Sequence, residues 1–162
     1  MSGTQAVAVL LEDRLITFTR AVSLLRRRNL PVRSIAVGPA QGSGLSRLTV
    51  MMQTDEATAD RAVKHLEKIV GVRQAVTFAA AESTTRELAL IKVRAPAERA
   101  GELLDVAQLY RCSVVDDTPE AWVLEVSGSE PFVLSCIRAL ERFGVLEVAR
   151  TGAVALDASS GN

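Results

Sequence analysis

The sequence predicts an α+β protein built from two tandem β-α-β-β-α-β units. Short apolar runs of strand length alternate with stretches of helical periodicity. A glycine-rich loop joins two apolar runs near position 40, and a similar order of elements starts again after residue 84. A unit of this kind forms the ferredoxin-like fold, so we expect two ferredoxin-like domains in one chain.

The first domain is organised around a hairpin between residues 32 and 53. Its two apolar runs, 32–37 and 45–52, are rich in Val, Ile and Thr, which favour strands. The loop between them holds three glycines and a proline, residues typical of turns. A strand at 5–11 precedes the hairpin, and a helix follows that strand because apolar residues from Phe18 recur at i, i+3, i+4 and i+7.

Residues at the helix ends support these assignments. Three arginines and Asn29 close the first helix, because cations complement the helix dipole and Asn tolerates a left-handed stop. Thr54, Asp55 and Glu56 offer a cap for a second helix, whose apolar face continues to Val70, and Gly71 ends it. A fourth strand at 72–78 completes the unit.

The second domain repeats the order in diverged form. We expect strands at 88–93, 112–115, 122–126 and 145–149, with helices at 96–110 and 132–143. These elements predict domains at 1–79 and 85–157, a linker at 80–84 and a disordered tail at 158–162.

Composition excludes several classes of function. The 19 basic and 19 acidic residues cancel, so the chain has no general attraction to nucleic acid or anionic lipid. No apolar run is long enough to span a bilayer, and no basic leader precedes the first strand. Two cysteines do not make a disulfide framework. We therefore expect a cytoplasmic protein that binds neither nucleic acid nor membrane.

Chemical motifs are also missing. His65 is the only histidine, and one His with two distant cysteines does not supply a metal site. Cys112 and Cys136 read as small buried hydrophobes, and Tyr110 and Trp122 as core or interface anchors. The glycine-rich loop lacks the lysine and spacing of a P-loop. We expect no catalytic residue, no metal and no cofactor bound by this chain.

Four segments resemble one family in order and spacing. Residues 33–50, RSIAVGPAQGSGLSRLTV, resemble the hairpin of the small regulatory subunit of acetolactate synthase, also called acetohydroxyacid synthase. Residues 86–93, 114–119 and 147–152 resemble three later segments of that family. The resemblance covers about residues 5 to 157.

The resemblance implies a function without chemistry of its own. In this family the N-terminal half is an ACT domain, through which the chain forms a homodimer. The dimer binds the large catalytic subunit, which holds thiamine diphosphate, Mg and FAD, and raises its activity in branched-chain amino-acid biosynthesis. Many members also transmit feedback inhibition by valine or another branched-chain amino acid.

The sequence departs from the family pattern at the effector loop. Asp13 and Ile16 stand where the family has asparagine and glycine, and Pro31 stands at a second asparagine position. The charge of Asp13 would repel a ligand carboxylate, Ile16 adds bulk, and Pro31 lacks an N–H. Each lost hydrogen bond costs about 1–3 kcal/mol, so we expect valine feedback to be weakened or lost. The altered effector pocket is expected at Asp13, Leu15, Ile16, Thr17, Asn29, Leu30, Pro31 and Val32.

The hairpin supplies the candidates for contact with the catalytic partner. These are Pro39, Gln41, Gly42, Gly44 and Arg47. Two other functions stay open at this stage: a free-standing ACT-type sensor of an amino acid, and, less favoured, a small enzyme on the same scaffold.

Overall fold

The computed structural model describes residues 3–158, which form two compact units. The N-terminal unit contains residues up to Thr85 and those from Ala153 onward, and the C-terminal unit is Arg86–Gly152. The C-terminal boundary of the second unit, at Gly152, differs from the sequence-based expectation, which extended the second domain to residue 157. Of the disordered tail expected at 158–162, residues 159–162 lie outside the described residues.

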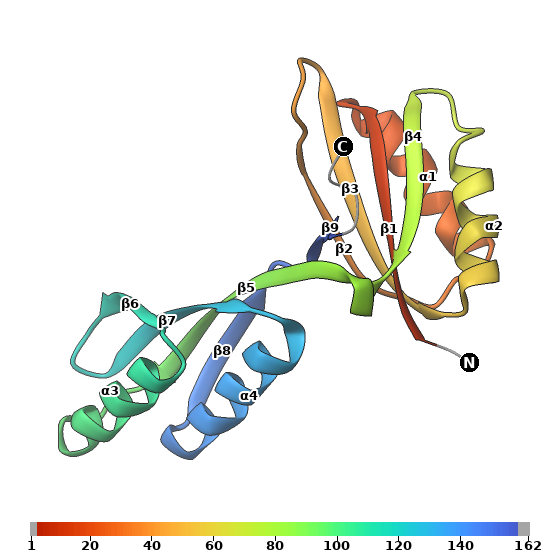
Figure 1. Ribbon diagram of the computed structural model, residues 1–162. Coiled ribbons are helices and arrows are strands. Elements are labelled where there is room, and N and C mark those ends of the chain that lie inside the picture. Colours follow the sequence, from red (N-terminus) through yellow and green to blue (C-terminus); the bar gives the residue numbers. More distant parts are fainter. Residues whose placement is uncertain (1–2, 159–162) are drawn as a thin grey trace. The chain divides into compact units, whose positions relative to one another are not determined.

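The N-terminal unit is a four-stranded antiparallel sheet with two helices on one face (Figure 1). The strand order is β2-β3-β1-β4. Its elements are β1 (Gly3–Glu12), α1 (Leu15–Arg27), β2 (Val32–Pro39), β3 (Leu45–Thr54), α2 (Glu56–Leu66) and β4 (Val72–Ala79). This confirms the predicted β-α-β-β-α-β order.

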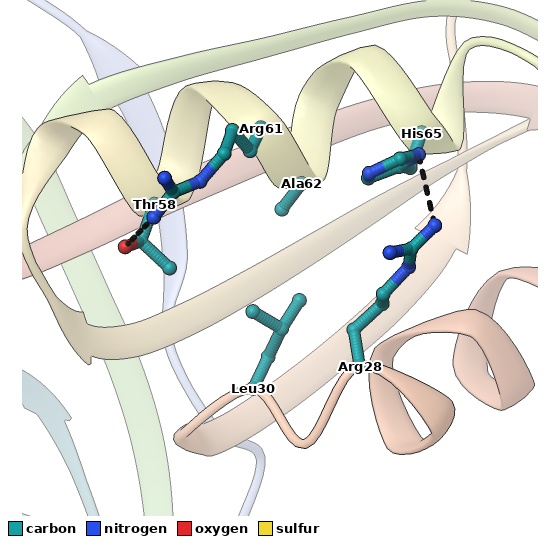
Figure 2. Close-up of a pocket in the computed structure, with 6 residues that line it drawn as sticks. All are labelled: Arg28, Leu30, Thr58, Arg61, Ala62 and His65. Atoms are coloured by element: carbon teal, nitrogen blue, oxygen red, sulfur yellow. Dashed lines mark hydrogen bonds between the residues drawn. The ribbon is translucent and has the colours of Figure 1, made fainter.

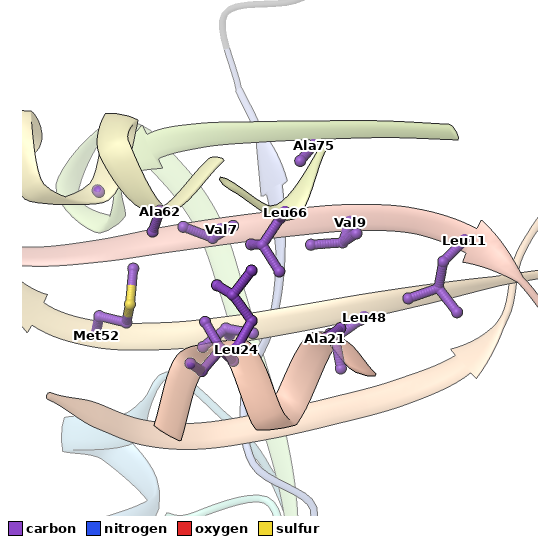
Figure 3. Close-up of a cluster of buried hydrophobic side chains, with 13 residues drawn as sticks. Val7, Val9, Leu11, Ala21, Leu24, Leu48, Met52, Ala62, Leu66 and Ala75 are labelled. Atoms are coloured by element: carbon purple, nitrogen blue, oxygen red, sulfur yellow. The ribbon is translucent and has the colours of Figure 1, made fainter. Parts of the chain in front are cut away.

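The core of this unit lies between the sheet and the helices. Val7 of β1 is paired with Val50 of β3, and Val9 with Leu48, so all four point to the same face. Ala21 and Leu24 of α1, with Ala62 and Leu66 of α2, meet them from the other side (Figure 3). The alternation along the strands and the helical spacing therefore bury the same apolar set that the sequence pattern indicates.

The helix ends follow the predictions with one exception. Asn29 has a φ of 49° and stops α1, while the side chain of Asp55 accepts the N–H of Thr58 at 2.7 Å and caps α2. The second helix was expected to reach Val70, but it ends at Leu66. The N–H groups of Lys68 and Ile69 bond three residues back, which tightens the chain into turns before β4.

Part of the other face of the same sheet is covered by residues 153–157. Ala153 and Ala155 pack against Ala6 and Met51, and the short strand β9 (Val154–Asp157) pairs with β5. The sequence analysis did not predict β9, because four residues give little periodicity. We call residues 153–157 the C-terminal strap.

The C-terminal unit has the same topology, with strand order β6-β7-β5-β8. The linker expected at 80–84 instead forms a 3₁₀ turn and the start of β5. Asp116 and Asp117, expected in a turn, belong to β6. In the chain, η1 (Ala80–Glu82) and the first residues of β5 (Ser83–Arg94) still belong to the N-terminal unit, and the rest of β5 belongs to the C-terminal unit. The other elements of the C-terminal unit are η2 (Ala97–Arg99), α3 (Ala100–Leu109), β6 (Ser113–Asp117), β7 (Ala121–Gly128), α4 (Glu130–Leu140), η3 (Glu141–Phe143) and β8 (Val145–Arg150).

Candidate functional site

The loop between β1 and α1 is tied to the central hairpin through Asp13. Its N–H donates to the carbonyl of Gly44 at 2.8 Å, and its Oδ1 accepts the hydroxyl of Ser46 at 3.0 Å. This carboxylate therefore already has a hydrogen-bond partner within the chain, and its negative charge lies in the loop between β1 and α1. The turn requires a φ of 71° at position 44, and Gly44 adopts it without strain because glycine has no Cβ.

The first turn of α1 presents two apolar side chains to solvent. Leu15 is 80% exposed and Ile16 is 53% exposed. No side chain caps this helix start, where Arg14 is extended. Thr17 is different, because it is only 2% exposed and lies against Gly71. Of the expected effector residues on this side, Asp13, Leu15 and Ile16 are exposed, so a ligand or a second chain could reach them.

The remaining effector candidates lie at the opposite end of α1. Asn29, Leu30, Pro31 and Val32 connect this helix to β2, and the carbonyl of Pro31 accepts the N–H of Gln53 at 3.1 Å. The helix has 13 residues and rises about 1.5 Å per residue, so its ends are about 20 Å apart. One copy of the chain therefore does not bring the two groups together.

The hairpin candidates have unequal environments. Gln41, Gly42 and Gly44 lie in an exposed loop, and Pro39 is the last residue of β2, paired with Ser46. Arg47 differs, because its Nη2 donates to the carbonyl of Ala155 in the C-terminal strap at 2.9 Å. A partner that used this guanidinium would compete with the strap for it.

A cavity of about 190 Å³ was missed by the sequence analysis. It lies between α2 and the segment that follows α1, and Figure 2 shows its lining. The lining residues are Arg28, Leu30, Thr58, Arg61, Ala62 and His65. The signal was present in the sequence, since Arg61 and His65 are four residues apart and share a helix face. Only the fold brings them to Arg28.

His65 and Arg28 meet at one end of this cavity. Their closest atoms, His65 Nδ1 and Arg28 Nη2, are 3.4 Å apart. Partial desolvation of the ring, together with the positive charges of Arg28 and Lys68, lowers the pKa of His65 from its ordinary value. The neutral ring is thereby favoured, and its Nδ1 can accept from the guanidinium.

The two cysteines also meet in the fold. Cys112 Sγ and Cys136 Sγ are 3.5 Å apart in the C-terminal unit, and both are free thiols. The hydrogen bond from Cys136 lowers the pKa of Cys112, whereas that same contact and burial raise the pKa of Cys136. The sequence placed both as small buried hydrophobes, which holds for Cys136, since it is fully buried.

Within residues 3–158, no group of three or more His, Cys, Asp or Glu side chains could hold a metal ion. Over the same part of the chain, no helix has the length and apolar character needed to cross a membrane.

Both units match models of one family. Residues 9–74 match the AHAS small subunit-like ACT domain, and residues 86–159 match the small subunit of acetolactate synthase. The two matches follow each other in the order of the two units, so they cover most of the chain.

Full-length relatives agree with the family models. The chain is 33% identical over 153 residues to the acetolactate synthase small subunit of Mycolicibacterium smegmatis, covering 94% of this chain and 90% of that one. It is 36% identical over 137 residues to acetolactate synthase small subunit 2, chloroplastic, of Arabidopsis thaliana, covering 85% of this chain and 29% of that one.

A solved structure shows the same architecture. The crystal structure of the acetolactate synthase small subunit from Thermotoga maritima matches with a TM-score of 0.89 and 30% identity, covering 95% of this chain and 96% of that one. The resemblance noted in the sequence is confirmed. This chain belongs to the family of acetolactate synthase small subunits.

Proposed function

We propose that this chain is the activating, regulatory subunit of an acetolactate synthase and performs no chemistry itself. The observation that carries the proposal is the match of both units, in order, to small subunits of that enzyme. The acetolactate-forming reaction, with its thiamine diphosphate, Mg and FAD, is assigned to a separate large catalytic subunit. The chain acts by binding that subunit and stabilising its active state.

The arrangement of α1 supports a homodimer through the ACT domains. The effector candidates at its two ends are about 20 Å apart within one chain. A second copy can supply the missing group, because β2 is an edge strand whose outer side can face another sheet. Sedimentation equilibrium is expected to give twice the mass of one chain. A monomer at working concentration would contradict this part of the proposal.

The same residues support weakened or lost feedback by valine. Asp13 keeps a negative charge where a ligand carboxylate would approach, and its Oδ1 is occupied by Ser46. Ile16 is half exposed, so its branched side chain fills space over the helix start. Pro31 offers a carbonyl, already used by Gln53, but no N–H.

Reconstitution with the large subunit tests the proposal. The rate of acetolactate formation is measured while the full chain is added to a fixed amount of catalytic subunit, with and without valine, leucine and isoleucine. We expect a saturable rise in turnover and little inhibition by any of the three amino acids. No change in turnover at saturation would refute activation, and would favour a free-standing amino-acid sensor.

A triple variant tests the account of feedback separately. Asp13→Asn, Ile16→Gly and Pro31→Asn together restore the residue types expected in the family. We expect this variant to gain inhibition by valine while still activating the partner. An Arg20→Asn variant, changed at an exposed position on α1, serves as the control and should gain none. Equal valine response in both variants would contradict the assignment of these three positions.

A further inference from the structure

The cavity between α2 and the end of α1 has a composition that suits one class of small molecule. Figure 2 shows Arg28 and His65 pointing toward each other at one end, with Arg61 beside Thr58 at the other. Leu30 and Ala62 lie between them. The lining thus joins basic ends to an aliphatic middle, and it contains no carboxylate.

Acidic side chains of the chain neutralise little of the positive charge around the cavity. Among residues 3–158, neither Arg28 nor Arg61 forms an ion pair. Arg61 Nη2 donates to the hydroxyl of Thr58 at 2.8 Å, and the contact of Arg28 is with the ring of His65. Asp55 interacts electrostatically with Arg61, and its carboxylate already caps α2 through the N–H of Thr58. An anion would therefore enter a region with excess positive charge.

We propose that this cavity binds a small aliphatic carboxylate. Its carboxylate lies against Arg28 and His65, and its hydrocarbon part lies on Leu30 and Ala62. Charge-assisted hydrogen bonds from a guanidinium to a carboxylate are among the strongest that a protein offers. The aliphatic side chains favour this ligand over inorganic phosphate, because phosphate would leave Leu30 and Ala62 exposed to water.

The volume limits the size of the ligand. A cavity of about 190 Å³ corresponds to about six water molecules, at about 30 Å³ each. Pockets for drug-sized ligands hold about 300–1,000 Å³. A carboxylic acid with a short branched tail fits this volume. The cavity shares only Leu30 with the expected effector pocket and lies within one copy of the chain, so it does not depend on the proposed dimer.

Binding is expected to involve the proton of His65. The charged groups acting on this ring are Arg28, from the end of α1, and Lys68, from its own helix, and both favour the neutral form. A bound carboxylate favours the protonated form instead. Affinity should therefore rise as the pH falls from about 8 to about 6, because the bound state takes up a proton.

Titration of the full chain with 3-methylbutanoate, followed by backbone NMR, tests the proposal. We expect saturable shifts at residues lining the cavity, and at least tenfold weaker binding in Arg28→Met. Arg20→Met, at an exposed position of α1, should bind like the wild type. His65→Gln should bind without the pH dependence. The large subunit is absent from this experiment, so its outcome is independent of the proposed regulatory function.

Several results would overturn the assignment. Equal binding of the neutral isostere 3-methylbutan-1-ol would show a purely apolar patch. Equal or tighter binding of inorganic phosphate would remove the role of the aliphatic middle. Undiminished affinity in Arg28→Met, or shifts that never saturate, would also contradict the proposal. Backbone spectra of each variant establish that it is folded before binding is compared.

Discussion

A substitution of Gly71 by alanine tests how the β1–α1 loop is held. Gly71 has a φ of 96°, a conformation that side chains rarely adopt. A Cβ added there would lie 2.8 Å from Thr17 Oγ1 and 2.9 Å from Thr17 Cγ2. Thr17 is buried at the start of α1, so it has little room to move away. The substitution therefore combines backbone strain with a steric clash.

The magnitude follows from those two costs. A left-handed backbone costs an L-residue about 1–2 kcal/mol. Forcing an extra methyl group into a packed site costs about 1–3 kcal/mol more. We expect Gly71→Ala to lower the free energy of unfolding of the N-terminal unit by about 2–5 kcal/mol.

Two other glycines separate these contributions. Gly44 has a φ of 71° but no atom within 4 Å of an added Cβ, so Gly44→Ala should show the strain alone, about 1–2 kcal/mol. Gly101 has neither feature and lies in the exposed part of α3, so Gly101→Ala should be neutral or stabilising by up to about 1 kcal/mol.

Native-state hydrogen exchange measures each effect in the unit where it occurs. A tenfold loss of amide protection corresponds to about 1.4 kcal/mol. Amides of β1 and β4 should therefore lose about 5- to 30-fold protection in Gly44→Ala, and about 30-fold or more in Gly71→Ala. Equal losses in these two variants would refute the claim that Gly71 is required because Thr17 packs against it.

The remaining predictions concern three polar groups. The lowered pKa of His65 means that the unfolded chain binds its proton more readily, so native stability is fully present above about pH 6.5 and falls as the pH decreases below it. The urea midpoint should thus fall less between about pH 7.5 and about pH 5.5 in His65→Gln than in the wild type. Iodoacetamide should modify Cys112 before Cys136, and at a lower pH than an ordinary thiol, as peptide mass spectrometry can establish. Glu87→Gln should destabilise the C-terminal unit by about 1–3 kcal/mol, because the buried Glu87 Oε1 accepts both Nε and Nη2 of Arg150, and Trp122 fluorescence follows that unfolding.

Matched variants make these three tests decisive. An unchanged pH response in His65→Gln would contradict the first, since this is the only histidine in the chain. Cys136→Ala should return the alkylation profile of Cys112 toward that of an ordinary thiol, and an unaltered profile would remove the proposed hydrogen bond. Glu102→Gln breaks the exposed pair with Arg99 and should cost less than Glu87→Gln.

The elements with long periodic patterns could be predicted from the sequence. The hairpin, both helices of the N-terminal unit and the stop at Asn29 depend on interactions between near neighbours. The early end of α2 and the start of β5 at Ser83 could not be predicted, because tertiary contacts decide where a helix or strand stops pairing. The C-terminal strap depends on the same kind of contact, since Ala153 and Ala155 are buried in a cluster with Ala6 and Met51, which are distant in sequence.

The candidate sites divide in the same way. The residues at positions 13, 16 and 31 are visible in the sequence alone, and the family resemblance is visible there too. Three contacts are not visible in the sequence. They are the hydrogen bond between Asp13 and Ser46, the hydrogen bond from Arg47 to the C-terminal strap, and the contact between Arg28 and His65. Each joins residues more than 30 positions apart, and no local pattern records such a pair.

By itself, the amino-acid sequence determined that this chain is a doubled α+β protein of the acetolactate synthase small-subunit family. Apolar alternation, helical spacing and turn residues are local properties, and they carry that information directly. Only the tertiary structure decided which polar groups are already engaged and where basic side chains converge on a cavity. The reason is physical: hydrogen bonding and burial depend on distances in space, which exist only once the strands have paired and the helices have packed on them.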